Sequence, residues 1–220
     1  MPVKKRSDNN TAALAMEVYR RLFAVYGECR CTLHYRTPHE LLVATILSAQ
    51  CTDKRVNMIT PELFRRYPDM AAFAAAEQPV LEALIRPAGF FRHKAESIIG
   101  ASRTIVEQFG GQVPATMAEL VTLPGIGRKT ANVILGDAFG VPGFPVDTHV
   151  NRVLNRIGVV ATEVPEKIEL RINTLLAPQY WVNFSHLLIL HGRETCKARQ
   201  PACAVCRLND ICAFVRRKKD

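Results

Sequence analysis

The sequence lacks an apolar run long enough to cross a membrane. Its longest such run, residues 41–49, is interrupted by Thr45 and Ser48, whereas a membrane-spanning helix needs about 20 mostly apolar residues. No apolar stretch follows the basic first residues, MPVKKRSDNN, so we expect no signal peptide. These absences favour the reducing cytoplasm, where thiols bind metals more readily than they form disulfides.

The sequence also lacks convincing β-strands, internal repeats and low-complexity segments. Apolar residues recur instead at helical spacing, and the first such series consists of Leu14, Val18, Leu22 and Val25. Side chains at this spacing share one face of a helix. The pattern predicts an all-α protein.

Helix caps and helical periodicity predict where most of the helices lie. Thr37, Pro38 and Glu40 supply an N-cap, a first-turn proline and a capping-box glutamate, and we expect Asp53 to cap the next helix. The loop at 140–145 carries two prolines and two glycines and is the clearest domain boundary. Further helices are expected at about 92–109, 117–121, 128–139, 148–157, 165–176 and 181–192.

Acidic residues are in the minority: 20 Asp and Glu stand against 29 Lys and Arg, which gives a formal net charge of +9. The excess is concentrated in residues 193–220, where eight Lys and Arg stand against three acids. A polyanion such as nucleic acid is the natural partner of a basic segment. Solubility alone is the alternative explanation of the charge.

Four of the seven cysteines lie in that basic segment, separated by six, two and five residues. They are Cys196, Cys203, Cys206 and Cys212. A cubane iron–sulfur cluster is bound by four thiolates, one at each iron, and it is larger than a single metal ion. Unequal sequence gaps between the four cysteines are therefore compatible with it. Structural zinc sites usually use two CxxC-like pairs, and only one such pair is present. The spacing favours a cluster over zinc, with disulfides or no ligand as further alternatives.

A glycine turn, LPGIG at 123–127, lies between two expected helices. Gly125 and Gly127 permit a tight turn and close approach to a ligand. The helix that opens at Arg128 directs free backbone N–H groups toward the turn, where they suit a phosphate. This is the layout of a helix-hairpin-helix motif, which holds DNA without reading its sequence. A plain corner between two helices is the alternative.

Three polar side chains near these segments could carry chemistry. Lys129 lies near the positive end of a helix dipole, which disfavours the ammonium and favours a nucleophilic amine; an ordinary surface lysine is the alternative. Asp147 can cap the helix that follows and, held there, stabilise a cation or accept a proton. Gln50 lies in a turn between helices, where its amide could bond a base or face solvent.

Five segments together resemble one family. They are LSAQCTD at 47–53, LPGIGRKT at 123–130, VDTHV at 146–150, LHGRETC at 190–196, and the C-x6-C-x2-C-x5-C spacing. In this order they resemble the bacterial endonuclease III family, the helix-hairpin-helix DNA glycosylases that carry a [4Fe-4S] cluster. The resemblance covers residues from about 10 to about 214.

The resemblance implies a bifunctional DNA glycosylase and AP lyase of base excision repair, which removes oxidised pyrimidines such as thymine glycol from duplex DNA. It implies that Lys129 forms a Schiff base with Asp147 as its carboxylate partner, and that Gln50 fills the gap left by the flipped base. Phe90 stands where the family often carries a bulky aliphatic wedge. The implied cluster ligands are Cys196, Cys203, Cys206 and Cys212, and the expected phosphate contacts are Gly125, Gly127, Arg128, Lys197 and Arg199.

The resemblance also implies two helical domains that flank a DNA-binding cleft. One is a six-helix barrel with the hairpin, here residues 31–141, and the other is a discontinuous cluster domain, here 1–30 and 142–220. We expect a monomer in the bacterial cytoplasm, associated with the nucleoid, with double-stranded DNA containing oxidised pyrimidines or abasic sites as its partner.

Two other functions stay open. An adenine-mismatch glycosylase of the same superfamily shares the cluster and the aspartate, but it lacks a lysine at the position of Lys129 and carries a further C-terminal domain. A non-catalytic DNA-binding module would use the same fold, and the presence of both Lys129 and Asp147 argues against it.

Overall fold

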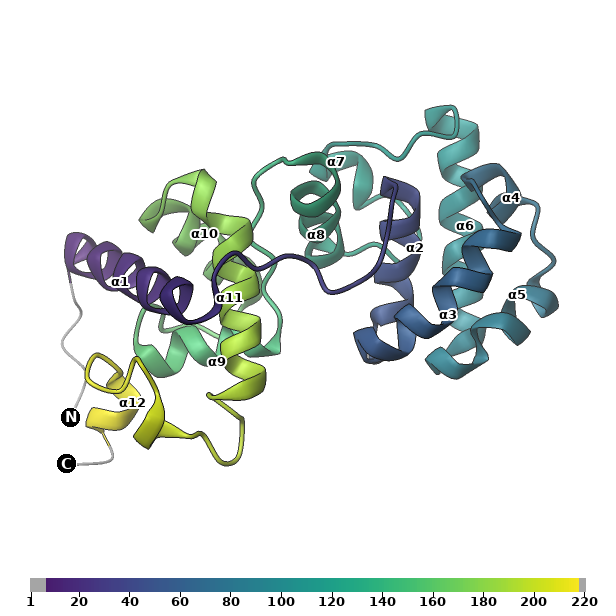
Figure 1. Cartoon of the computed structure of the whole chain (residues 1–220). Coiled ribbons are helices and arrows are strands. Elements are labelled where there is room, and N and C mark those ends of the chain that lie inside the picture. Colours follow the sequence, from purple (N-terminus) through teal and green to yellow (C-terminus); the bar gives the residue numbers. More distant parts are fainter. Residues whose placement is uncertain (1–6, 218–220) are drawn as a thin grey trace. The chain divides into compact units, whose positions relative to one another are not determined.

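The structure, a computed structural model, describes residues 7–217, and every regular element among them is a helix (Figure 1). The prediction of an all-α protein is therefore confirmed. None of the helices in this range is long and apolar enough to cross a membrane. Residues 1–6, at the basic start of the chain, and Lys218, Lys219 and Asp220, at its basic end, lie outside the described residues.

The described chain divides into two compact units. Residues 31–141 form one, which we call the hairpin unit because it contains the glycine turn. The described residues before Cys31 and after Val141 form the other, which we call the cysteine unit because it contains the four clustered cysteines. Each unit has its own apolar core.

The hairpin unit is built around one helix, α2 (Pro38–Ser48), which is buried along most of its length. A helix that is apolar all round belongs inside a core, and α2 accordingly packs against helices from three other parts of the unit. The unit's other helices are α3 (Asp53–Arg66), α4 (Met70–Ala74), α5 (Gln78–Ile85), the short 3-10 helix η1 (Arg86–Ala88), α6 (Phe91–Phe109), α7 (Met117–Leu120) and α8 (Arg128–Phe139).

The cysteine unit packs its helices around the fully buried rings of Phe144 and Phe184, whose centroids lie 5.9 Å apart. One of these helices begins at Thr148 and buries an apolar stripe, while its polar face carries Arg152 and Arg156. The unit's helices are α1 (Asp8–Tyr26), α9 (Thr148–Ile157), α10 (Pro165–Leu175), η2 (Pro178–Tyr180), α11 (Trp181–Glu194), η3 (Cys203–Val205) and α12 (Ala213–Arg216).

Two of the predicted helix caps differ in detail from the structure. Thr52, not Asp53, caps α3, because its hydroxyl accepts the Arg55 N–H at 3.3 Å. Thr37 caps α2 as predicted. Glu40, however, accepts from the Arg36 N–H at 2.7 Å, so only half of a capping box forms.

Helix α11 runs two residues past its approximate predicted end at Gly192, to Glu194. This glycine serves helix packing: a Cβ atom there would lie 2.8 Å from the Cβ of His149 on α9. The prediction also missed α4 and α5, which are too short for a helical repeat to be recognised.

Candidate functional site

The glycine turn joins α7 to α8. Its two glycines differ in whether the fold could accept a side chain at their positions. Gly125 has φ +76°, and a Cβ atom there would lie 2.6 Å from the Cβ of Ser97 on α6. The fold itself therefore requires glycine at 125. Gly127 caps α8 with an extended backbone, and a Cβ atom there would meet nothing within 4 Å. The space beside Gly127 is open.

The start of α8 presents backbone N–H groups that no side chain caps. Such an end carries partial positive charge and suits an anion. Arg128 and Lys129 occupy its first turn, and both are exposed. The turn, the uncapped helix end and Lys129 thus lie together at one end of α8.

Gln50 and Phe90 share a rare backbone conformation. They are the two non-glycine residues among 7–217 with positive φ, at +53° and +47°. A left-handed conformation costs a side-chain-bearing residue about 1–3 kcal/mol and persists only where the surroundings enforce it. Gln50 is exposed, and Phe90 is 67% exposed although its side chain is apolar.

Both of these residues line one cavity of about 190 Å³ in the hairpin unit, together with Gly125 and Thr130 from the hairpin. Three segments that are distant in the sequence therefore converge on one opening. Lys94 also lines it, although this lysine is only 4% exposed. Sequence reasoning missed Lys94, but one signal was available: it lies one turn before the buried Ile98, on the apolar face of α6.

Asp147 caps α9, as predicted. Its Oδ1 accepts from the backbone N–H groups of His149 and Val150, both at 2.8 Å. The side chain is half-buried, and Oδ2 has no hydrogen-bond partner among residues 7–217. One oxygen therefore fixes the orientation of the carboxylate while the other stays available for chemistry.

The four clustered cysteines line a single small cavity in the cysteine unit, of about 20 Å³. All four are free thiols: Cys196, Cys203, Cys206 and Cys212. Two of their sulfur atoms face N–H donors, since the Leu208 N–H lies 3.4 Å from Cys206 Sγ and Arg156 Nη1 lies 3.5 Å from Cys196 Sγ. Such donors stabilise thiolate sulfur. In the described range, no three His, Cys, Asp or Glu side chains are grouped so as to hold a single metal ion.

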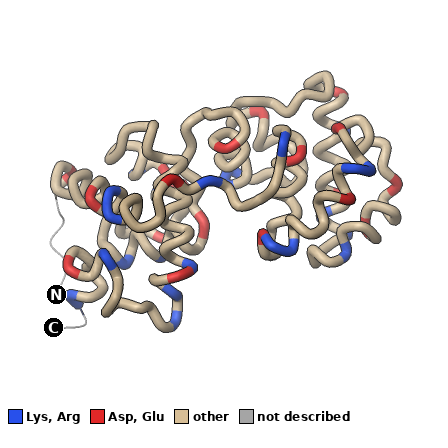
Figure 2. The backbone as a smooth tube through the Cα atoms, viewed as in Figure 1, with Lys and Arg blue, Asp and Glu red and all other residues tan. Residues whose placement is uncertain are grey.

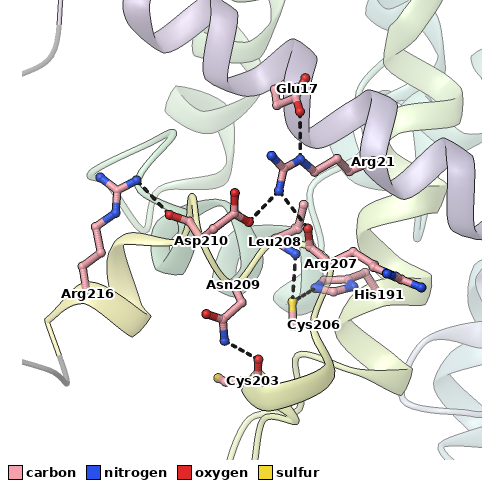
Figure 3. Close-up of polar contacts among 10 residues, drawn as sticks. All are labelled: Glu17, Arg21, His191, Cys203, Cys206, Arg207, Leu208, Asn209, Asp210 and Arg216. Atoms are coloured by element: carbon pink, nitrogen blue, oxygen red, sulfur yellow. Dashed lines mark hydrogen bonds and ion pairs between the residues drawn. The ribbon is translucent and has the colours of Figure 1, made fainter.

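The loop around these cysteines is held from two helices by arginines. Arg21 on α1 donates to Asp210 Oδ1 at 2.6 Å and to the Arg207 carbonyl at 3.1 Å, and it is itself paired with Glu17 (Figure 3). Hydrogen bonding from this guanidinium lowers the pKa of Asp210. The loop has little regular structure of its own, so these anchors fix its path.

Helix α9 supplies the second set of anchors. Arg156 donates to the carbonyls of Lys197 and Ala198, both at 2.7 Å, and Arg152 donates to the Cys196 carbonyl at 3.1 Å. Asp147 is the N-cap residue of the same helix. One rigid element therefore joins the candidate carboxylate to the cysteine loop.

The basic side chains expected to meet phosphate are exposed in both units. Lys197 and Arg199 are exposed on the cysteine loop, and Arg128 is exposed on the hairpin. Basic residues are distributed over both units and interspersed with acidic ones (Figure 2). Lys129 belongs to the hairpin unit and Asp147 to the cysteine unit.

Known proteins resemble this chain in both sequence and structure. Residues 43–178 match the model of the HhH-GPD superfamily base excision DNA repair protein. The chain is 51% identical over 199 residues to endonuclease III of Synechocystis sp., covering 90% of this chain and 91% of the relative. It is 39% identical over 202 residues to endonuclease III of Escherichia coli strain K12, covering 92% and 96%.

Two solved structures of endonuclease III with DNA are also similar. One is a non-covalent complex, with a TM-score of 0.90 and 35% identity over 94% of this chain and 98% of that one. The other is a trapped covalent intermediate, with a TM-score of 0.90 and 35% identity over 95% and 99%.

The two hairpin glycines should respond differently to the same substitution. Gly125→Ala should lower the free energy of unfolding by about 3 kcal/mol or more, because it adds a left-handed side chain and an overlap with Ser97. Gly127→Ala should lower it by at most about 1 kcal/mol, since only N-cap preference is lost. Chemical denaturation measures both, and equal losses would contradict the distinction.

Proposed function

The chain belongs to the endonuclease III family within the HhH-GPD superfamily of base excision DNA repair proteins, and we propose that it excises oxidised pyrimidines from duplex DNA. It is a DNA glycosylase and AP lyase. One observation carries the proposal: an exposed lysine follows the hairpin directly, at the uncapped end of α8. The related endonuclease III has been trapped in a covalent intermediate with DNA, which supports a covalent mechanism. The adenine-mismatch and non-catalytic alternatives gain no comparable support.

The hairpin is proposed to hold a DNA phosphate. The open space beside Gly127 allows a phosphate to approach the backbone, and the first N–H groups of α8 supply hydrogen bonds. Arg128 adds a positive charge at the same end of the helix. Contacts of this kind position a protein on DNA without reading sequence. Double-stranded DNA is thus the expected partner.

Lys129 is the proposed nucleophile. Its neutral amine attacks C1′ of the flipped nucleotide, the C1′–N bond breaks, and the base leaves with that electron pair and takes up a proton. The nitrogen then gives up its extra proton, the C1′–O4′ bond breaks as O4′ takes up a proton, and an iminium forms between C1′ and the lysine nitrogen. This iminium acidifies the hydrogens at C2′. Loss of one of these protons then breaks the C3′–O bond, which cleaves the strand on the 3′ side. A positioned amine is required for each step.

Asp147 is the proposed carboxylate partner. Its capped Oδ1 prevents the side chain from rotating, and Oδ2 can face the developing positive charge on the sugar or accept the proton that Lys129 loses. The carboxylate is supplied by the cysteine unit and the amine by the hairpin unit.

Gln50 and Phe90 are proposed to stabilise the opened duplex. A base within a duplex can be attacked only after it is flipped out, which costs a few kcal/mol. The amide of Gln50 can bond the bases left behind, and the exposed ring of Phe90 can stack on them. Base–aromatic stacking is worth about 1–3 kcal/mol, enough to offset much of the unstacking.

The four clustered cysteines are proposed to hold a [4Fe-4S] cluster. Four free thiols around one cavity, with N–H donors aimed at two of the sulfurs, fit such a group. The cysteine spacing favours a polynuclear group over one zinc ion, because it contains only one CxxC-like pair. Its proposed role is structural. It holds residues 197–201 so that Lys197 and Arg199 meet phosphates.

The nucleophile can be tested by trapping. Borohydride should trap wild-type protein covalently on duplex DNA that contains thymine glycol, and Lys129→Ala should lose both the trapped complex and strand cleavage. Lys129→Gln should still bind the duplex. Lys167→Ala, an exposed lysine on α10, is the matched control and should behave as wild type. Cleavage at the wild-type rate without Lys129 would refute the assignment.

The carboxylate can be separated from the cap. Asp147→Asn should keep stability near that of wild type, because Asn caps a helix about as well as Asp, yet lower cleavage by about 100-fold or more through the lost charge. Asp147→Ala should lose activity and also about 1 kcal/mol of stability. Thermal denaturation and single-turnover cleavage measure the two effects. An activity loss that only followed the melting temperature would leave Asp147 as a cap alone.

The cluster predicts colour and metal content. Anaerobically purified protein should be yellow-brown, absorb at about 400 nm and contain about four irons per chain. Metal analysis and absorbance spectroscopy measure this. Cys203→Ser should lower the iron content, while Cys51→Ser, in the hairpin unit, should not. One zinc per chain with no iron would exclude the cluster.

A further inference from the structure

Lys94 is a buried cation that the proposed chemistry does not use. It lies on α6 and is 4% exposed. Its ammonium donates to two backbone carbonyls, Leu47 O at 2.8 Å and Ala88 O at 2.9 Å, and forms no ion pair with a carboxylate among residues 7–217. Burial lowers the pKa of Lys94. A buried charge needs such partners, so the two carbonyls explain why the side chain points inward.

The first carbonyl lies at the end of α2. Three of the last four carbonyls of this helix are satisfied locally, by the Ser48 hydroxyl and by the backbone N–H groups of Ala49 and Cys51. Leu47 O is the fourth, and Lys94 satisfies it from another helix. A cation at a helix C-terminus is also favoured by the helix dipole. The chain then reaches Gln50 and its left-handed backbone.

The second carbonyl lies at the end of η1, directly before a turn in which Gly89 and Phe90 both have positive φ. Lys94 holds this turn at both ends. Its ammonium bonds Ala88 O, and its backbone N–H bonds Phe90 O at 3.1 Å. Phe90 is 67% exposed and lines the cavity.

One nitrogen atom thus ties together the two segments that carry Gln50 and Phe90. These are the two left-handed non-glycine residues of the described chain, and both line the same cavity as Lys94. Strained residues persist where surrounding contacts enforce them. The ammonium bridge is such a contact for both loops.

We propose that Lys94 is a positioning residue that fixes Gln50 and Phe90 relative to each other, so that both side chains enter the opened duplex together. The inference rests on the proposed function, because it takes these two residues to contact DNA. Loosening the bridge would let either loop relax toward an ordinary conformation. Binding to a flipped-base duplex would then weaken, because the ordering that Lys94 provides in advance would have to occur during binding.

The test is a mutant cycle on lesion DNA. Lys94→Met keeps the side-chain length and removes the donors. On duplex containing thymine glycol it should weaken binding about tenfold or more, and on single-stranded DNA with an abasic site it should change cleavage less than about twofold. In a Gln50→Ala/Phe90→Ala background, the same substitution should weaken duplex binding by less than about twofold, since the residues it positions are gone.

A purely structural role predicts a different result. If Lys94 only satisfied two carbonyls, Lys94→Met would weaken binding by the same factor in both backgrounds, and this would overturn the inference. Ser102→Ala is the matched control: it removes a buried hydrogen bond to Ile98 O on the same helix and should leave the ratio of duplex to single-strand activity unchanged. Lys94→Leu, which also lacks the donors, replaces Lys94→Met if the latter does not fold.

The two proposals fail in different ways. Wild-type protein that never cleaves lesion duplex would refute the proposed function. Cleavage by wild type together with full duplex affinity in Gln50→Ala/Phe90→Ala would refute the inference and the proposed roles of Gln50 and Phe90. The proposed excision activity would stand. A different result would refute only the inference: the double variant loses affinity, but Lys94→Met weakens binding by the same factor with and without Gln50 and Phe90.

Discussion

Backbone groups at helix ends must find partners, and in this all-α protein their partners decide where the candidate functional groups lie. The N-terminal groups of α8 have no side-chain cap and stay available to an anion. Those of α9 are bound by Asp147, which fixes a carboxylate. The last open carbonyl of α2 is bound by Lys94, which fixes the start of the loop that contains Gln50. One physical requirement, met in three ways, produces an anion site, an oriented acid and a constrained loop.

The backbone carbonyls of the cysteine loop must also find hydrogen-bond partners, and the loop has little regular structure to supply them. Its carbonyls at 197 and 198 are bound by Arg156, and the carbonyl of Cys196 is bound by Arg152. Burial lowers the pKa of His191 to about 4, so this ring stays neutral beside Cys206 Sγ, 3.7 Å away. Guanidinium groups from α1 and α9 position the loop. The four thiols remain available to bind the proposed cluster.

The sequence was sufficient for features that depend on neighbouring residues. Thr37 was recognised as a cap and Asp147 as another, because a cap acts within three residues of itself. The functional assignments of Lys129 and the cysteines came from motif order and spacing and remain predictions. Features that depend on distant packing were missed. Gly192 resembled a helix end because nothing local shows that His149 lies against it, and Lys94 was missed because its carbonyl partners lie on other elements.

The contact between Gly125 and Ser97 has an evolutionary consequence. Ser97 is buried on α6, three residues after Lys94, and its Cβ would lie 2.6 Å from any Cβ at position 125. Helix α6 thus sets the distance of the hairpin from the loops that carry Gln50 and Phe90. Glycine is already the smallest residue, so position 125 cannot shrink to accommodate a larger neighbour. Position 97 can therefore drift only among small side chains, although it takes part in no chemistry.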